Sequence, residues 1–295
     1  MNTVKLTNDK QPILRIALQK SGRLTEQSLE LLKDCGIQLP VGGRKLVAPA
    51  SNFPMEVYFL RSSDIPAYVA DGVADVGILG ENVLLEKEVT VDTILPLGFA
   101  QCRLSLAIPK GETYTGVEYW QDKEIATSYP NTLRRFLTEN KVTANVQMIS
   151  GSVEIAPSIG LADGVCDLVS SGSTLLSNGL KEVAIILESE AVLVANKDLA
   201  VPKKALLEQL IFRMRANQAA ANNKYILLNA PNDKVATISA LLPGMKSPSI
   251  MPLGDSGWSS LHSVVKETAF WERIDALKAA GAEGILVLPI EKMIV

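Results

Sequence analysis

The chain has 295 residues, 47% of them hydrophobic, so it can bury more than one core, and we expect two or three compact units. Its 29 lysines and arginines against 32 aspartates and glutamates give a net charge of -3, which excludes a global positive field for holding nucleic acid or an anionic membrane. Three widely spaced cysteines, Cys35, Cys102 and Cys166, fit neither a disulfide framework nor a zinc site and predict a reducing compartment.

The chain opens with a polar stretch, residues 1–12, that lacks the apolar core of a secretory signal. No later apolar run approaches the roughly 20 residues needed to span a bilayer. We therefore expect a cytoplasmic protein that is neither exported nor anchored in a membrane.

Short apolar runs then alternate with helical patterns. We expect strands at 14–18 and 57–60 and helices at 25–35 and 65–71. This alternation is typical of an α/β protein with a mainly parallel sheet.

One pattern occurs twice. ADGVADVGILGENVL (70–84) aligns without a gap to ADGVCDLVSSGSTLL (162–176), with seven of fifteen positions identical. Each copy predicts a helix end, an aspartate, a short buried strand and a glycine that opens the next helix. A chance match between two common βα units is the alternative, but a similar strand-like segment follows each copy, at 101–110 and 189–197.

We therefore expect two α/β lobes joined by two crossing strands, with the ligand in the cleft between them. The first lobe comprises residues 1–108 and 190–222, where a helix at 203–222 closes the body. The second lobe comprises residues 109–189.

Residues 223–295 predict a separate small domain. The expected order is βαββαβ, with strands at 225–229, 249–253, 258–265 and 284–289 and helices at 233–241 and 268–280, which is the ferredoxin-like arrangement. His262, the single histidine, alternates with apolar residues and is expected to be a packed strand residue. Without a GxSxG motif, a Ser-His-Asp hydrolase is not indicated.

The strongest candidate for ligand binding follows a buried strand at 165–169. Gly172 permits close approach of the backbone to a ligand, and the amides of 172–175 would face an anion. Helix capping is the alternative, but a cap needs one hydroxyl and this turn offers four. We expect an anion-binding loop made of Asp167, Ser170, Ser171, Gly172, Ser173 and Thr174.

Other candidate loops also follow strands. Lys20, Ser21, Gly22 and Arg23 form a cationic turn suited to a polyphosphate, with a plain surface turn as the alternative. The first-lobe partner of the anion loop contains Asp75, Gly77, Gly80 and Asn82. In the second lobe, the candidates Ser128, Tyr129 and Pro130 precede a helix at 131–140.

Three arginines and one glutamate complete the candidate set. Arg103, on the first crossing strand, could contact a phosphate or a base, whereas Arg134 and Arg135 predict a solvated helix face. Glu154 stands at a loop-to-helix junction, where it either forms half of a capping motif with Ser152 or contacts a ligand.

Taken together, these motifs resemble the long-form ATP phosphoribosyltransferases, the first enzymes of histidine biosynthesis. The resemblance covers nearly the whole chain and rests on ALQKSGRL, DGVADVGILGEN, CRLSLAIP, IATSYP, SGSVEIAP, DLVSSGSTLLSNGL and ILVLPIEKM. The family's loop usually has threonine where Ser171 stands, so the hydroxyl is retained and its fine positioning differs.

The resemblance implies a bilobal catalytic body of the type II periplasmic-binding-protein class with a C-terminal ferredoxin-like regulatory domain. It implies 5-phosphoribosyl diphosphate at Asp167–Thr174 and Glu154. It also implies ATP near Lys20–Arg23, Asp75–Asn82, Arg103 and Ser128–Pro130.

The same resemblance implies Mg2+ as cofactor, histidine as inhibitor and dimers that assemble into hexamers. Asn229 and Ser249 are the candidate histidine contacts, and no residue is assigned to the metal. Two alternatives share parts of the pattern: a non-catalytic solute-binding protein or sensor of the same fold, and a different phosphoribosyltransferase.

Overall fold

The computed structural model describes residues 11–40, 46–242, 244, 247–255 and 257–294. Of the polar N-terminal stretch, only Gln11 and Pro12 are among them. The chain divides into two compact units, Met1–Leu207 and Glu208–Val295. No helix among the described residues is long and apolar enough to cross a membrane.

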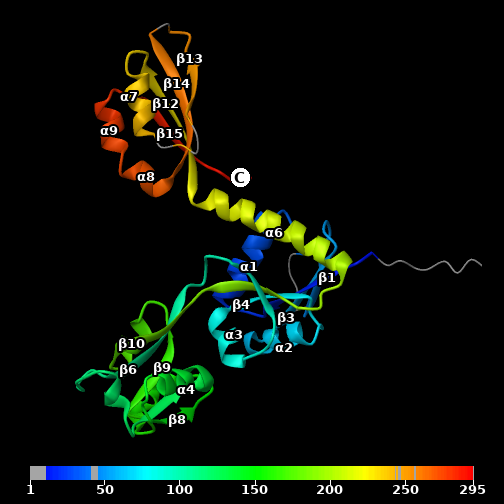
Figure 1. The fold of residues 1–295 in the computed structure, drawn as a ribbon, viewed down its shortest axis with the longest axis vertical. Helices are drawn as coiled ribbons and strands as arrows, with labels where there is room; N and C mark the ends of the chain where they lie inside the picture. Colours follow the sequence, from blue (N-terminus) through cyan, green and yellow to red (C-terminus); the bar gives the residue numbers. More distant parts are fainter. Residues whose placement is uncertain (1–10, 41–45, 243, 245–246, 256, 295) are drawn as a thin grey trace, which may run out of the picture. The chain divides into compact units, whose positions relative to one another are not determined.

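The first unit contains a six-stranded mixed sheet in the order β2-β3-β1-β4-β11-β5 (Figure 1). Its strands are β1 (Leu14–Gln19), β2 (Val47–Pro49), β3 (Met55–Leu60), β4 (Val76–Gly80), β5 (Asp92–Pro96) and β11 (Ala191–Ala195). β1 pairs in parallel with both β3 and β4, and β11 runs antiparallel to β4 and β5. Leu14, Ile16 and Leu18 are fully buried, because β1 lies inside the sheet between β3 and β4 and helices α1 and α2 contact it. The connecting helices are α1 (Arg23–Asp34), η1 (Ser62–Asp64), α2 (Ile65–Ala70) and α3 (Glu81–Lys87).

A second, five-stranded sheet has the order β10-β6-β9-β7-β8. Its strands are β6 (Cys102–Pro109), β7 (Glu124–Thr127), β8 (Asn145–Met148), β9 (Gly164–Val169) and β10 (Leu180–Ser189). The helices are η2 (Val117–Trp120), α4 (Pro130–Glu139), η3 (Val153–Ile155), η4 (Pro157–Ile159) and α5 (Ser173–Ser177). Fully buried Trp120 packs with Leu104 and Leu106 in the core of this lobe.

Two stretches of chain connect the sheets, as predicted, and β6 and β10 lie side by side as an antiparallel pair (Figure 1). The second connection differs from the prediction of one long strand at 189–197: Ser189 ends the ten-residue β10, which belongs to the other sheet, and β11 covers only Ala191–Ala195. The chain therefore changes sheet at Glu190. Backbone bonds from Leu97 N to Ala191 O (2.9 Å) and from Ala191 N to Phe99 O (2.9 Å) hold the two connections together.

The repeated pattern is only partly repeated in structure. Gly80 and Gly172 each precede a helix, as expected. The first copy begins where α2 ends at Ala70, but the second copy follows two 3-10 turns, so the predicted α-helix end at Ala162 is wrong.

The second unit is an antiparallel sheet in the order β13-β14-β12-β15 with helices α7 to α9, and α6 (Val201–Ala221) spans the boundary between the units. Its elements are β12 (Asn223–Pro231), α7 (Val235–Leu241), β13 (Ser249–Pro252), β14 (Trp258–Lys266), α8 (Glu267–Trp271), α9 (Ile274–Ala279) and β15 (Glu283–Pro289). The single helix predicted at 268–280 is instead two helices, because Arg273 has a φ of -117°, outside the helical range. The fold class, a bilobal α/β body followed by a ferredoxin-like domain, is confirmed.

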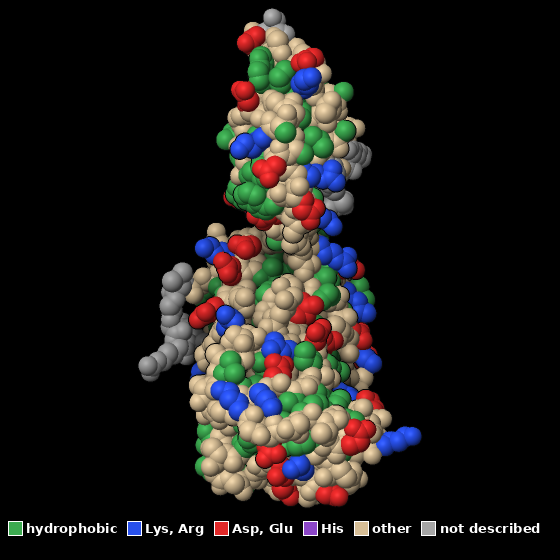
Figure 2. Space-filling view, turned by 90° about the vertical axis from the view of Figure 1, so that its left-hand side faces the viewer, with side chains coloured by type: hydrophobic (Ala, Val, Ile, Leu, Met, Phe, Trp, Pro, Cys, Tyr) green, Lys and Arg blue, Asp and Glu red, His purple; other side chains and the backbone are tan. Residues whose placement is uncertain are grey.

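The surface agrees with the near balance of charge. Acidic and basic side chains are interspersed on the face in Figure 2, and neither sign forms a continuous field there.

Candidate active site

The predicted loops gather at two sheet edges. β1 and β4 are neighbouring parallel strands, so Lys20–Arg23 and Gly80–Asn82 lie beyond the same edge of the first sheet. β7 and β9 are likewise parallel neighbours, which places Ser128–Pro130 beside Ser170–Thr174. In α/β proteins, ligands bind at such carboxyl edges.

Asn82 joins the two edges. Its Nδ2 donates to Tyr129 Oη (3.1 Å), its Oδ1 accepts from Ser189 Oγ (3.0 Å), and its backbone N–H donates to the same Oγ (3.0 Å). A Cβ at Gly80 would collide with Asn82 Oδ1, so glycine is required for this side-chain position. The two lobes therefore meet at a buried polar contact beside the connection between them.

Tyr129 lies close to the anion loop. Burial, assisted by the charge of Asp167, raises the pKa of Tyr129 to about 12, so its hydroxyl remains protonated at neutral pH. It can therefore donate a hydrogen bond while it accepts the one from Asn82.

The anion loop presents exposed hydroxyls around a left-handed glycine. Gly172 has a φ of 80°, and among the described residues beyond its chain neighbours only Val169 Cγ1, at 3.9 Å, lies within 4 Å of a Cβ built there. The hydroxyls of Ser171 and Ser173 lie 2.9 Å apart. Because α5 has only five residues, its dipole is small, and the predicted contribution of a helix N-terminus is weaker than the hydroxyl donors.

Asp167 is partly buried at the start of this loop. Burial raises the pKa of Asp167, and the nearby Glu154 raises it further, while the hydrogen bond from Leu168 N–H lowers it. The Ser152 hydroxyl makes no capping bond at η3, so the capping alternative for Glu154 is not formed. Two carboxylates therefore lie near one another with no cation paired to Asp167 among the described residues.

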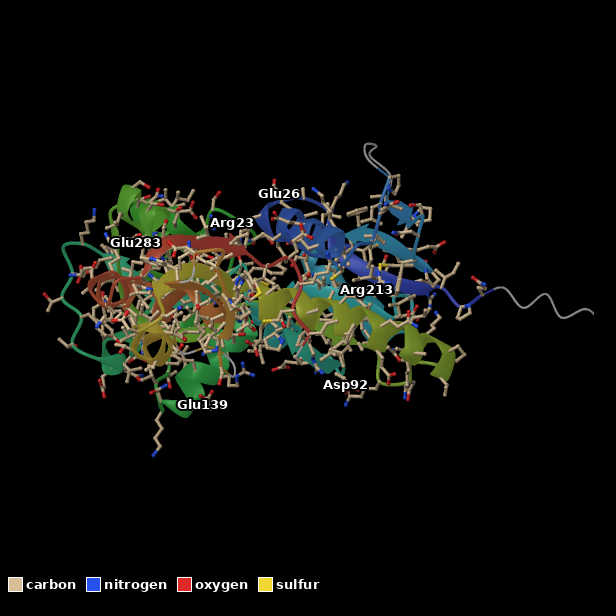
Figure 3. All side chains as sticks on the ribbon, turned by 90° about the horizontal axis from the view of Figure 1, so that it is seen from above. Arg23, Glu26, Asp92, Glu139, Arg213 and Glu283 are labelled. Atoms are coloured by element: carbon tan, nitrogen blue, oxygen red, sulfur yellow. The ribbon has the colours of Figure 1, made fainter. Side chains whose placement is uncertain are left out.

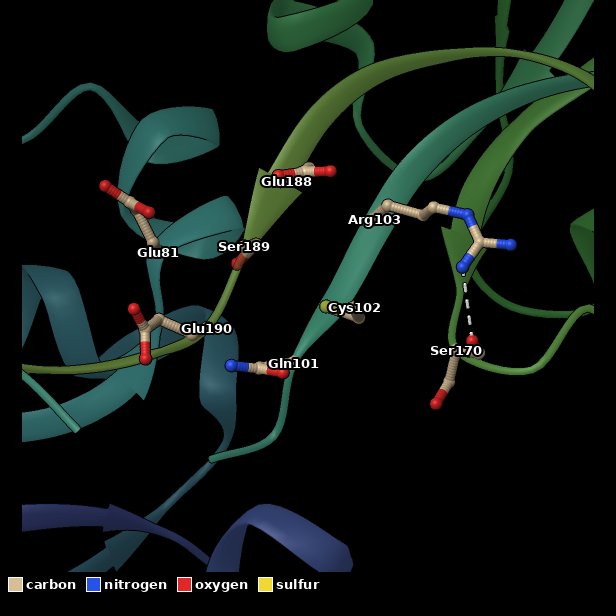
Figure 4. A pocket seen from close by; sticks show the side chains of 8 residues that line it. All are labelled: Glu81, Gln101, Cys102, Arg103, Ser170, Glu188, Ser189 and Glu190. Atoms are coloured by element: carbon tan, nitrogen blue, oxygen red, sulfur yellow. Dashed lines mark hydrogen bonds between the residues drawn. The ribbon is translucent and has the colours of Figure 1, made fainter. Parts of the chain in front are cut away.

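Arg103 reaches the loop from β6. Its Nε and Nη2 donate to the two carboxylate oxygens of Glu182 at 2.5 and 2.6 Å, and its Nη1 donates to the Ser170 carbonyl at 3.3 Å. Arg103 and Ser170 border a hollow of about 530 Å³. Figure 4 shows Glu81, Glu188 and Glu190 on one side of it and Arg103 with Ser170 on the other.

A second hollow, of about 650 Å³, lies by the Ser128–Pro130 loop. Arg134, predicted as part of a solvated face, lines this hollow together with Lys87. Beside it the Glu86 carboxylate accepts the backbone N–H groups of Asn131 (3.0 Å) and Thr132 (2.9 Å), so a residue of α3 caps α4. The Ser128 hydroxyl itself donates to Ile149 O (2.6 Å).

The Lys20–Arg23 turn is exposed. Gly22 has a φ of 104°, and Gln19 Nε2 donates to Ser21 O (2.6 Å), which closes the turn. Figure 3 labels Arg23 beside Glu26 at the beginning of α1. Neither Lys20 nor Arg23 forms an ion pair with another residue that the structure describes, so both remain available to an anion.

Asp75 and Gly77 do not join this edge. Asp75 precedes β4, at the far end of that strand from Gly80, and its carboxylate pairs with Arg15 (3.0 Å) and Lys203 (2.7 Å). Gly77 lies within β4, where a Cβ would come 2.7 Å from Ile65 Cγ2 of α2. These contacts favour structural roles for both residues.

Glu86, Glu182 and Ser189 were missing from the sequence-based set. Glu182 directly precedes the apolar run Val183–Leu187. Had a strand been predicted over 180–189, Glu182 would have been recognised as a charged residue within it. Glu86 has no local signal, because acidic residues are common on helix surfaces. Ser189 could have been found from its position where the chain changes sheet.

In the second unit, Asn229 pairs with Ser260 and Ser249 pairs with His262, which puts the four residues on one face of the sheet. His262 Nδ1 lies 2.8 Å from Tyr225 Oη, and its Nε2 lies 3.2 Å from Ser260 Oγ. Across the described ranges, no disulfide joins the cysteines, and no group of three or more histidine, cysteine, aspartate or glutamate residues could hold a metal ion.

Known proteins match the chain over both units. A family model described as ATP phosphoribosyltransferase matches residues 61–216, and one described as HisG, C-terminal domain, matches residues 220–292. The ATP phosphoribosyltransferase of Cytophaga hutchinsonii is 58% identical over 282 residues, which is 96% of this chain and 99% of the relative. That of Bacteroides thetaiotaomicron is 56% identical over 283 residues, covering 96% and 100%.

A solved structure agrees with these relatives. A chain of the ATP phosphoribosyl transferase (HisG:HisZ) complex from Thermotoga maritima superposes with a TM-score of 0.61 at 28% identity, covering 69% of this chain and 96% of that one. These matches over nearly the whole chain agree with the paired sheet edges and the left-handed Gly172. The chain therefore belongs to the ATP phosphoribosyltransferases, the transferases that begin histidine biosynthesis.

Proposed function

We propose that the protein transfers the phosphoribosyl group of 5-phosphoribosyl diphosphate to N1 of the adenine of ATP, releasing pyrophosphate. The observation that carries this proposal is the joining of the two sheet edges. A hydroxyl-rich loop with Asp167 faces Tyr129 and Asn82, so two ligands can be held in one cleft.

In this proposal each substrate has its own edge. The phosphoribosyl diphosphate is held in the second lobe by Asp167, Ser170, Ser171, Gly172, Ser173, Thr174 and Glu154. ATP is held across the cleft by Lys20, Ser21, Gly22, Arg23, Gly80, Asn82, Arg103, Ser128, Tyr129 and Pro130. The predicted lobes are residues 1–108 with 190–222 and residues 109–189. Most of β6 falls in the first of these ranges although it pairs in the sheet of the second lobe, and residues 208–222 group with the C-terminal unit.

The chemistry requires positioning more than a nucleophile. The bond from the anomeric carbon to the diphosphate breaks as adenine N1 approaches from the opposite face, so the sugar gains positive charge and the leaving group gains negative charge. Hydroxyl and N–H donors of the loop stabilise the leaving group, and the partly buried Asp167 lies beside the electron-poor sugar. A cleft that holds both substrates in line provides the orientation.

The donor set suits Mg2+. Asp167 and Glu154 are hard oxygen ligands, and the raised pKa of Asp167 reflects a buried carboxylate without a cationic partner among the described residues. Mg2+ commonly binds through one or two carboxylates together with substrate phosphates. When bound there, it would neutralise charge on the diphosphate.

The second unit, residues 223–295 in the predicted division, is proposed to be the regulatory domain that binds histidine, with Asn229 and Ser249 as candidate contacts. We propose dimers that assemble into hexamers. Removal of residues 224–295 is expected to abolish inhibition by histidine, measured as activity against histidine concentration. Inhibition of the truncated protein at the same concentrations would contradict this role.

The catalytic proposal is tested by mixing the protein with ATP, 5-phosphoribosyl diphosphate and Mg2+ and following the ultraviolet absorption change expected when adenine N1 is alkylated. Omission of either substrate is the control. Binding of both ligands with no absorption change under any condition would favour the alternative, a ligand sensor of the same fold.

A further inference from the structure

We propose that Glu182 is a positioning residue for the anion loop: it holds the Arg103 guanidinium in the orientation that lets Arg103 bind the loop at Ser170. Glu182 thereby sets how tightly the loop binds a sugar diphosphate. This inference rests on the proposed function, since it concerns the same loop and ligand.

The geometry of the pair fixes the guanidinium. Both oxygens of Glu182 accept from Arg103, at 2.5 Å from Nε and 2.6 Å from Nη2. Such bidentate pairing holds the planar fork in one orientation, which a single contact does not. The remaining nitrogen, Nη1, then points to the Ser170 carbonyl at 3.3 Å (Figure 4).

Glu182 is itself held in place. The Ser105 hydroxyl, whose residue is 1% exposed, donates to Glu182 Oε1 at 2.7 Å. The register of β10 against β6 shifts between Glu182 and Ala184, an irregularity of the kind that re-aims a side chain. Ser105 in turn pairs in register with Asp167 on β9. One strand, β6, therefore carries both contacts of Glu182 alongside the loop.

A purely structural role would require the Arg103–Glu182 ion pair to contribute substantially to stability. Both side chains are partly exposed, 30% for Arg103 and 24% for Glu182, and ion pairs in such positions contribute little to stability. The pair also lies where β9 enters the loop, since Arg103 pairs in register with Val169. The expected consequence of its loss is therefore a looser loop in a folded protein.

The test is Glu182→Gln, with Lys181→Gln as the matched control on the same strand. Lys181 contacts the Glu112 carbonyl and lies outside the binding machinery. We expect Glu182→Gln to raise the KM for phosphoribosyl diphosphate by roughly 10-fold, the effect of losing one hydrogen bond to a charged group. The KM for ATP should rise as well, because Arg103 also belongs to the proposed ATP set, while the midpoint of thermal unfolding changes little. Unchanged or tighter sugar diphosphate binding in Glu182→Gln overturns the proposal.

A double-mutant cycle separates action through Arg103 from direct action. In an Arg103→Met background, Glu182→Gln should add almost nothing, because the group that it positions is absent. A full additional loss in that background would overturn the positioning role.

Calorimetric binding of phosphoribosyl diphosphate in the presence of Mg2+ gives a readout that does not depend on turnover. If the wild-type protein binds this ligand but makes no phosphoribosyl-ATP, the proposed function fails, and the comparison of wild type with Glu182→Gln still decides the role of Glu182. If the wild type is active and Glu182→Gln binds equally well, only the role of Glu182 fails.

Discussion

In residues 70–84 the aspartate of the repeated pattern, Asp75, precedes its strand and pairs with Arg15 and Lys203. In residues 162–176 the aligned Asp167 lies inside β9 and has a raised pKa. The difference arises because β9 begins earlier: Gly164 packs against Trp120, where a Cβ would lie 2.5 Å from the ring, whereas Gly72 forms a turn after α2. Equal residues in two βα units therefore do not have equal roles when the strands begin at different positions.

A second aligned pair shows the same effect. Gly77 leaves room for α2, and its counterpart Val169 is a core residue, 3% exposed, in a lobe where 3-10 turns replace that helix. The packing element on the strand decides which side chain fits.

The largest effect is expected at Gly172, the glycine that precedes the helix in the second copy of the repeated pattern. Gly172→Val should lower activity by at least about 100-fold, because a Cβ branch displaces a ligand at the loop. Gly179→Val is the control, since Gly179 has a similar φ of 72° and no atom of the described part of the chain, its own neighbours aside, lies within 4 Å of its Cβ position. Turnover and thermal unfolding are measured for both. An equal loss of activity in the two variants would attribute the effect to backbone strain.

The two aspartates should separate stability from activity. Asp75→Asn is expected to lower the free energy of unfolding by about 3–5 kcal/mol, because it leaves Arg15 and Lys203 without their shared partner. Asp167→Asn should remove activity and leave stability equal or higher, since it removes a buried charge. Urea unfolding and turnover test both, and a stable Asp75→Asn protein would refute the assigned role.

The pH dependence of these variants should have opposite signs. Burial alone would raise the pKa of Asp75, but the hydrogen bonds from Arg15 and Lys203 outweigh it and hold this pKa below its ordinary value. The contribution of Asp75 to the free energy of unfolding is therefore complete above the pKa of aspartate in the unfolded chain, about 3.9. It is lost as the pH falls through the pKa of Asp75 in the folded protein. The raised pKa of Asp167 means that its contribution is present below the unfolded pKa and lost as pH rises through the folded one.

Unfolding in urea at a series of pH values checks these signs. The stability gap between wild type and Asp75→Asn should shrink on acidification below about pH 4. Any advantage of Asp167→Asn over wild type should appear at neutral pH and vanish in acid.

The smallest of these effects concerns Gly77. Gly77→Ala should cost about 1–3 kcal/mol in the free energy of unfolding, because the new Cβ overlaps Ile65 and Val69 of α2. Gly111→Ala is the matched control, because a Cβ at Gly111 would have no atom within 4 Å from the residues that the structure describes, its chain neighbours aside. A loss in the free energy of unfolding no larger than that of the control would show that α2 moves freely to make room for the new Cβ.

Much of the site was predictable because its signals are local. The loop at Gly172 was found from a glycine among hydroxyls after an apolar run, and the turn at Gly22 from a glycine between two cations. Both glycines have a positive φ, a backbone conformation that residues other than glycine rarely adopt. The placement of Asp75 could not be predicted, because the repeat shows which residues are equal and not where each strand begins.

The sequence by itself determined much of the order of strands and helices, the ferredoxin-like pattern of the C-terminal unit and the glycine-led loops, because periodicity and backbone conformation depend on neighbouring residues. It did not show β10 as a strand of the second sheet or the break between α8 and α9. Only the tertiary structure decided which charged and polar groups meet. Arg103 and Glu182 are 79 residues apart, Asn82 and Ser189 are 107 apart, and Asp75 and Lys203 are 128 apart. The order of strands in the sheets brings these partners together, and a charged residue in the sequence does not indicate which residue it will contact.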